Sequence, residues 1–341
     1  MKTKRIGSQT VKLQSPPCIA AYAAVGGKME GDGPLAKSYD YLSDDPYFGA
    51  KSWESAESAM LKKCFDLVIG KSGISENELD YILSGDLLNQ CVGSAFAIKG
   101  SNAPFFGLYG ACSTMAESLS LAAMLVDGGY ANQVCALTSS HFCSAERQFR
   151  LPLAYGGQRT PTAQWTATAA GALIIKASGD GPFVTHITTG KIVDGGICDA
   201  ANMGAAMAPA ALETLCTHFA DTERKPTDYD LIVTGDLGVT GHEILLELAL
   251  KNGLDLAPVC DDCGMMIYDR EKQDVHAGGS GCGCSASVLA GHLLPQVKSG
   301  KIKRLLFAAT GALMSPTTAL QGESILGICH AVAIDFECGT K

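Results

Sequence analysis

The chain carries two copies of one pattern, and this internal duplication constrains its fold more than any single motif. The segment Leu79–Leu87 (LDYILSGDL) is similar to Tyr229–Leu237 (YDLIVTGDL). A Cys-Ser pair then opens a helix-like stretch at Cys112, and another does so at Cys284. Both copies run helix, loop, short apolar strand, Cys-Ser, helix, strand, an order typical of βαβ units. We therefore expect an α/β protein built from two related halves.

The duplication also predicts where a functional site lies. Asp86 and Asp236 follow equivalent strands, and Cys112 and Cys284 open equivalent helices. A site made between the halves would use the Asp86 and Cys112 loops of the first half and the Asp236 and Cys284 loops of the second.

Apolar spacing places the predicted elements along both halves. In the first half, residues 1–180, we expect loops and an early edge strand over 1–50, helices over 52–69 and 113–126, and strands over 79–83, 134–138 and 169–176. In the second half, residues 181–341, we expect helices over 208–219, 242–251 and 284–298, strands over 230–234, 304–310 and 328–336, and a strand-rich insertion over 253–278. No long linker separates the halves, so a shared core is predicted.

Charge and composition exclude several classes of partner. The net charge of −9 argues against nucleic acid or anionic lipid, which both favour clustered Lys and Arg. No apolar run reaches the roughly 18 residues of a membrane span, and no signal-peptide core follows Met1. Fourteen cysteines in such a chain indicate reduced thiols and a cytoplasmic compartment.

The turn before Cys112 is the strongest candidate for chemistry. Gly110 permits a sharp bend, and a helix N-terminus directly after it favours a thiolate through its free N–H groups and dipole. The alternative is a buried structural cysteine, because free Cys is among the most buried residue types.

Several separate motifs resemble one protein superfamily. They are GDLLNQ (85–90), GACST (110–114), TSSH (138–141), AERQFR (145–150), YGGQ (155–158), MAPAA (207–211) and GGSGCGCSA (278–286). With the duplicated halves, they resemble the thiolase superfamily and, within it, the dipicolinic-acid-binding proteins of sporulation and spore germination. This resemblance implies a five-layer αβαβα fold, and a homodimer that pairs through the strand after the Cys112 helix.

The resemblance also separates a binding protein from an enzyme. Condensing enzymes of this superfamily need His with His or Asn beside the cysteine to move protons and hold an oxyanion. The corresponding places read Asp236-Leu237-Gly238 and 280–283 (SGCG), and His242 should already lie on a helix. We expect no catalysis. Cys282 could act as an acid or base, which keeps a ketoacyl-acyl-carrier-protein synthase III-like acyltransferase as the alternative.

The ligand that the resemblance implies is dipicolinic acid, pyridine-2,6-dicarboxylate. It is a planar dianion, best held by Arg, hydroxyls and helix N-termini. We therefore expect it near Cys112 and Cys282, with Ser139, Ser140, His141, Arg147 and Arg150 in the loop that returns over the cysteine. The two arginines either meet the ligand or pair with acidic residues at a dimer contact.

Asp86, Asn89 and Asp236 end strands near the same place. They either orient polar groups, help carry a calcium ion that arrives with the ligand, or cap local structure. No cofactor is expected. Cys260 and Cys263 have the spacing of half a zinc site, but the Cys282–Cys284 pair that would complete it is better explained by the duplication.

The resemblance implies partners as well as a ligand. We expect the chain to be peripheral at the forespore inner membrane, held there by the membrane-embedded proteins of the spore dipicolinate channel. Residues 1–50 and 253–278 lie outside the duplicated core and are the expected contact surfaces.

Overall fold

The computed structural model describes residues 4–149 and 159–338, and its main sheet has the internal symmetry that the duplication predicts. The strand order is β13-β12-β15-β16-β10-β3-β9-β7-β5-β6, so equivalent strands of the two halves stand at equivalent distances from the centre. The first half supplies β3 (Cys18–Gly26), β5 (Tyr81–Gly85), β6 (Phe105–Gly107), β7 (Gln133–Ser140) and β9 (Ala169–Lys176). The second supplies β10 (Phe183–Thr188), β12 (Leu231–Thr234), β13 (Cys260–Asp262), β15 (Arg304–Leu313) and β16 (Leu326–Asp335).

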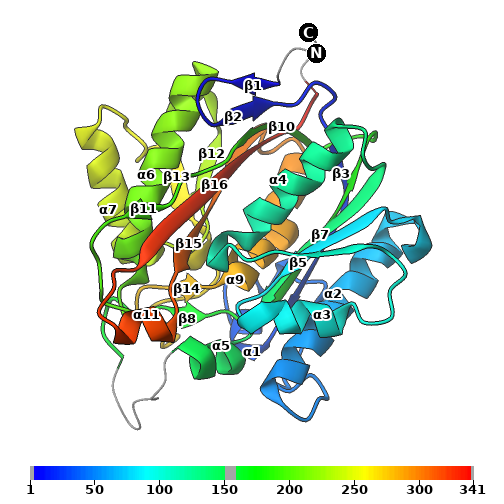
Figure 1. Cartoon of the computed structure of the whole chain (residues 1–341), viewed down its shortest axis with the longest axis horizontal. Helices are drawn as coiled ribbons and strands as arrows, with labels where there is room; N and C mark the ends of the chain where they lie inside the picture. The colour runs from blue at the N-terminus through cyan, green and yellow to red at the C-terminus, as the bar shows by residue number, and fades with distance from the viewer. Residues whose placement is uncertain (1–3, 150–158, 339–341) are drawn as a thin grey trace.

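Helices cover both outer faces and fill the space between the halves, as Figure 1 shows. The outer helices are α2 (Trp53–Ser72) and α3 (Val92–Ala97) on the first half and α6 (Met203–Thr222) and α7 (Gly238–Lys251) on the second. The inner helices are α4 (Thr114–Asp127) and α9 (Cys282–Val288), which continues through a π-helical turn into α10 (Leu294–Lys298). The predicted five-layer αβαβα fold is confirmed.

Shorter elements complete the chain. They are β1 (Arg5–Ile6), β2 (Thr10–Lys12), α1 (Lys28–Gly31), β4 (Tyr41–Leu42), α5 (Phe142–Phe149), β8 (Trp165–Thr166), β11 (Val193–Asp194), α8 (Cys263–Met266), β14 (Gly279–Ser280) and α11 (Pro316–Leu320). The predicted division at residue 180 falls in the connection between β9 and β10.

The inner helices pack so closely that two positions require glycine. A Cβ atom on Gly171 of β9 would lie 2.3 Å from the Ala286 carbonyl oxygen of α9, and one on Gly283 would lie 2.2 Å from the Ala169 carbonyl oxygen. Since neither contact is sterically tolerable, these glycines allow α9 to lie directly on the sheet. This approach brings the start of α9 close to the start of α4.

The expectation for residues 1–50 was wrong. Cys18–Gly26 forms the nine-residue strand β3, which lies between β9 and β10 near the centre of the sheet and is mostly buried. The expected strand-rich insertion over 253–278 was also wrong, because it contains only the three-residue β13 and the short helix α8 before β14.

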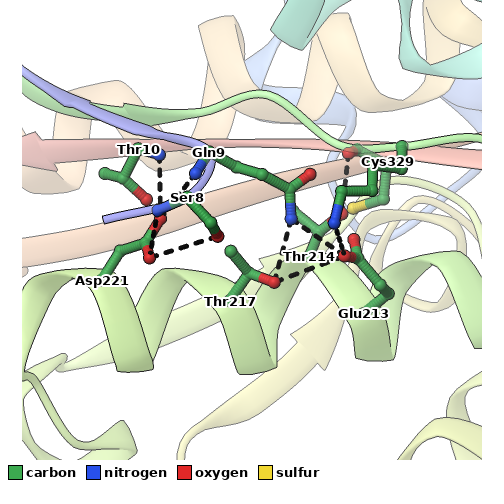
Figure 2. Close-up of polar contacts among 9 residues, drawn as sticks. Ser8, Gln9, Thr10, Glu213, Thr214, Thr217, Asp221 and Cys329 are labelled. Carbon is green, nitrogen blue, oxygen red and sulfur yellow. Dashed lines mark hydrogen bonds and ion pairs between the residues drawn. The ribbon is translucent and has the colours of Figure 1, made fainter. Parts of the chain in front are cut away.

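The first residues are fastened to the second half (Figure 2). The Asp221 carboxylate, near the end of α6, accepts backbone N–H bonds from Ser8, Gln9 and Thr10 at 2.7, 2.8 and 2.9 Å. Strand β2 pairs with β10 directly after this contact. These contacts attach the β1–β2 hairpin to α6 and β10 of the second half.

The expected dimer contact cannot form as predicted. Strand β7, which follows the Cys112 helix, is paired with β5 on one side and β9 on the other, so it has no edge to offer a second chain. The strand at this end of the sheet is β6, and all three of its residues are exposed.

Candidate functional site

The Cys112 turn lies between β6 and α4 and is held from both sides. Ala111 adopts a left-handed conformation with φ of 50°, which is strained for a residue with a side chain. The Ser113 hydroxyl donates to the Gly110 carbonyl at 2.7 Å, and the Thr114 hydroxyl donates to the Ala111 carbonyl at 2.6 Å. From the other half, Gly311 of β15 lies so close that a Cβ there would be 2.3 Å from the Gly110 oxygen. The turn is therefore rigid.

Cys112 faces a cavity of about 450 Å³, counted with its opening to solvent. Little of this volume is enclosed free space, so the cavity is narrow. Both halves contribute to the lining, which is Leu87, Tyr109, Ala111, Cys112, Ala145, Glu146, Phe149, Thr166, Met203, Ser280, Ala312 and Met314. Most of these side chains are apolar. Among the described residues, the lining has no Lys, Arg, His or Asn.

The Cys112 thiol lies beside the carboxylate of Asp236, from the second half, and interacts with it electrostatically. Burial and this negative charge raise the pKa of the thiol well above its usual value. Burial and the neighbouring carboxylate therefore act against the effect of the helix N-terminus and favour the protonated thiol, which agrees better with the alternative of a buried structural cysteine.

The buried side chain of Asp236 accepts three hydrogen bonds. Its carboxylate accepts bonds from the Ser280 hydroxyl at 3.1 Å, the Gly281 N–H at 2.8 Å and the Thr310 hydroxyl at 3.0 Å. Burial nevertheless raises the pKa of Asp236 to about 6, because the donors offset only part of the cost of removing the charge from water.

Cys282 lies beside Cys112 at the start of α9. With Leu87 and Ala145, the two cysteines form a small buried cluster. The Cys282 thiol donates to the Ser139 carbonyl at 3.0 Å, and the side chain is fully buried and does not line the cavity.

The predicted Ser139, Ser140 and His141 are buried and engaged in the fold. The Ser139 hydroxyl donates to the Glu57 carboxylate at 3.0 Å, and the Ser140 hydroxyl donates to the Ala167 carbonyl at 2.7 Å. His141 Nε2 lies 2.8 Å from the Pro46 carbonyl oxygen. None of the three predicted side chains lines the cavity.

Asp86 and Asn89 also lie outside the cavity lining. The buried Asp86 carboxylate accepts backbone N–H bonds from Leu88 at 2.9 Å and Ser94 at 2.7 Å, so it shapes the turn before α3. Exposed Asn89 accepts a bond from the Gln148 amide at 2.9 Å. Of the three alternatives, the contacts of Asp86 fit a local cap, whereas Asn89 pairs with the Gln148 side chain.

Arg147 points away from the cavity. Its guanidinium forms an ion pair with Glu54 of α2, and its side chain is 52% exposed. One expectation for Arg147 was a pair with an acidic residue at a dimer contact. Its observed partner, Glu54, is acidic but belongs to the same chain. Arg150 lies outside the described residues.

The cavity contains residues that the sequence alone did not single out. Tyr109 precedes the Cys112 turn, Glu146 and Phe149 lie on α5, and Thr166 lies on β8. One available signal was helical spacing, because Ala145 and Phe149 are four residues apart and share one face of α5. Met203, Ala312 and Met314 come from distant segments of the second half and carried no local signal.

The described part of the chain contains no metal centre. Within residues 4–149 and 159–338, no group of three or more His, Cys, Asp or Glu side chains is arranged to hold a metal ion. Likewise, no helix in these ranges is long and apolar enough to cross a membrane.

This arrangement, two duplicated halves with a cysteine at the start of an inner helix, defines a thiolase-like protein. The structure resembles 3-oxoacyl-[acyl-carrier-protein] synthase III from Aquifex aeolicus VF5, with a TM-score of 0.58 and 16% identity over 94% of this chain and 99% of that one. It also resembles cerulenin-bound OleA from Xanthomonas campestris, with a TM-score of 0.61 and 12% identity over 95% and 100% of the two chains. At these identities the likeness concerns the fold alone.

Sequence comparison narrows the class to one family. The family model of stage V sporulation protein AD matches residues 7–335. Stage V sporulation protein AD of Bacillus subtilis (strain 168) is 41% identical over 338 residues, which cover 99% of this chain and 100% of the relative. The chain belongs to the stage V sporulation protein AD family.

Proposed function

We propose that this chain binds dipicolinic acid in the cavity beside Cys112 and supports its uptake into the developing spore without catalysing a reaction. The observation that carries the proposal is the position of the Cys112 thiol beside the buried Asp236 carboxylate. A protonated thiol beside a fixed negative charge is a poor nucleophile, but it is a suitable wall of a binding pocket. The resemblance to dipicolinic-acid-binding proteins supplies the ligand.

The lining suits a flat aromatic molecule with polar substituents. Leu87, Phe149 and Met314 offer apolar surface for a pyridine ring. Hydroxyl groups of Thr166 and Ser280 enter the same cavity and are donors for carboxylate oxygens.

Charge favours a ligand whose two carboxylates are neutralised. Glu146 lines the cavity, and Asp236 lies directly behind Cys112. We therefore retain calcium as a companion of dipicolinate, because a hard cation held by the ligand's oxygens would cancel this repulsion. Dipicolinate with calcium should bind more tightly than dipicolinate alone.

Calorimetric titration of the full chain tests the proposal. The variant Ala312→Leu places extra atoms in the cavity and should abolish binding, whereas Arg147→Ala removes only an exposed ion pair and should leave affinity unchanged. Cys112→Ala should weaken binding by about 1 kcal/mol, the size of one lost hydrogen-bond contact. Equal affinity for wild type and Ala312→Leu, with folding intact, would place the ligand elsewhere.

Acyl transfer from Cys112 is the second candidate, and the position of Cys112 at the start of α4 favours it. Asp236 opposes it, because a carboxylate repels the negative charge that develops on a thioester oxygen. Incubation with acyl-coenzyme A followed by intact-mass analysis should give no adduct. A stable acyl group on Cys112 would favour the enzyme.

The proposal includes a peripheral place at the forespore inner membrane, maintained by membrane-embedded partners. With β2 and β3 fastened into the sheet, the part of residues 1–50 that remains for such a contact is the stretch after β3. Fractionation of sporulating cells should find the protein with membranes when the partners are present and released when they are deleted.

A further inference from the structure

Two cysteines from opposite halves, Cys112 and Cys282, lie in one buried cluster beside the cavity. The proposed binding function gives no role to Cys282. Cys112 lies in the turn directly before α4, and Cys282 opens α9. The Ser285 hydroxyl lies 3.5 Å from the Cys112 carbonyl oxygen and 3.3 Å from the Cys282 carbonyl oxygen. Both cysteine backbones therefore flank one side chain, and both side chains belong to one buried cluster.

The two thiols differ in access from the cavity. Cys112 lines it, whereas Cys282 is fully buried and does not line it. Both are free thiols in this structure. A small reagent entering the cavity would meet Cys112 first, and Cys282 would be the nearest thiol to any group formed there.

We propose that Cys112 and Cys282 are a redox pair that a small-molecule disulfide converts into a disulfide bond between the two halves. Cys112 loses its proton and attacks one sulfur of the reagent, which forms a mixed disulfide and releases one small thiolate. Cys282 then loses its proton and attacks Cys112 Sγ, which forms the Cys112–Cys282 bond and releases the second small thiolate. The two protons lost by the cysteines end on the two small thiols, and the reagent gains the two electrons that the cysteines give up.

The local electrostatics set the rate of this exchange. Burial raises the pKa of both thiols, and negative neighbours raise it further. Because the thiolate is the attacking species, the reaction should be slow at neutral pH and should accelerate as the pH rises.

Oxidation would change the cavity directly. The disulfide removes the Cys112 thiol that now lies beside Asp236, and it draws Cys112 Sγ toward α9. This effect on dipicolinate rests on the proposed function, but formation of the bond does not.

The test uses the full reduced chain and glutathione disulfide, without dipicolinate. Wild type should lose two hydrogen atoms from its intact mass, and proteolysis after alkylation should yield a linked peptide pair containing Cys112 and Cys282. Cys282→Ser should instead accumulate a glutathionyl group on Cys112. The control Cys198→Ser removes an exposed cysteine and should form the link as wild type does.

Three results would overturn the pairing: a lasting glutathionyl group on Cys112 in wild type, a link to another cysteine, or an unreacted Cys112 after long exposure at raised pH. Cys282→Ala provides a second variant if serine prevents folding. Binding of dipicolinate to the reduced protein is measured separately, so failure of the redox pair and failure of the binding proposal are distinguishable.

Discussion

Asp236 is the residue that decides what Cys112 can do. A helix N-terminus normally favours a thiolate, yet here burial and the negative charge of the neighbouring Asp236 carboxylate raise the pKa of Cys112. The sequence predicted that Asp236 would lie near Cys112, at a place where condensing enzymes have His or Asn. It could not predict the direction of the thiol's pKa, because that depends on burial and on a contact between halves far apart in the chain.

The first prediction concerns the pH dependence of stability. In the folded protein the pKa of Asp236 is raised from 3.8 to about 6, so the folded state holds this proton more tightly than the unfolded state. Wild type should therefore lose stability, relative to Asp236→Asn, as the pH rises from about 4 to about 6, by about 3 kcal/mol in total. Urea unfolding of both proteins across this range measures the difference. A constant difference would show that Asp236 titrates normally.

The same variant should change the reactivity of Cys112. Asparagine keeps an oxygen for the Ser280 and Gly281 donors and removes the negative charge that raises the pKa of Cys112. Alkylation of Cys112 by iodoacetamide at mildly alkaline pH should be faster in Asp236→Asn than in wild type, with exposed Cys198 as the internal reference. A slower or unchanged rate would remove Asp236 as the cause.

At the scale of elements, the N-terminal hairpin shows a long-range contact that depends on one side chain. Asp221 lies at the C-terminal end of α6, where the helix dipole disfavours a negative charge. Its three backbone N–H bonds from residues 8–10 compensate for this position and attach the hairpin, as Figure 2 shows.

Asp221→Ala should destabilise the protein by about 1–3 kcal/mol, because backbone donors of the hairpin lose their acceptor. These bonds lower the pKa of Asp221, so the contribution should be present above its usual value of 3.8 and should disappear as the pH falls through the lower folded value. Urea unfolding checks the change, with Glu247→Ala at an exposed position of α7 as the control. Wild-type stability in Asp221→Ala would show that β2 holds the hairpin without this residue.

Some helices and strands could be predicted from the sequence, and others could not. The strand at 169–176 was predicted with its observed bounds, and the helix after Cys112 shifted by only one residue. Strand β3 was missed because Pro16-Pro17 and Gly26-Gly27 enclose an alanine-rich run that resembles a loop. In the fold, those small side chains suit a central strand with covered faces. The cavity was only partly predictable, because the second half places Ser280, Ala312 and Met314 in it through tertiary packing.

At the scale of the whole molecule, the two ends of the symmetric sheet differ. Strand β13 is partly buried, whereas β6 exposes Phe105 and Phe106 together with free backbone groups. A bare aromatic edge is a site for strand pairing. We therefore predict that the homodimer pairs through β6 and not through β7.

Phe106→Lys should shift a dimer toward monomer, because a lysine on an edge strand opposes pairing. Leu250→Lys places the same charge on exposed α7 and should leave the assembly unchanged. Sedimentation analysis of the three proteins gives the masses. A wild-type monomer, or an unaffected Phe106→Lys dimer, would exclude this contact.

The most direct test of the account is protection of Cys112 by the ligand. The reduced chain is alkylated with and without saturating dipicolinate and calcium, and the rates at Cys112 and Cys198 are followed by peptide mass analysis. Because Cys112 lines the proposed site and Cys198 is exposed elsewhere, the ligand should slow alkylation at Cys112 and leave Cys198 unchanged. Unchanged alkylation of Cys112 while dipicolinate is bound would contradict a site between the two halves.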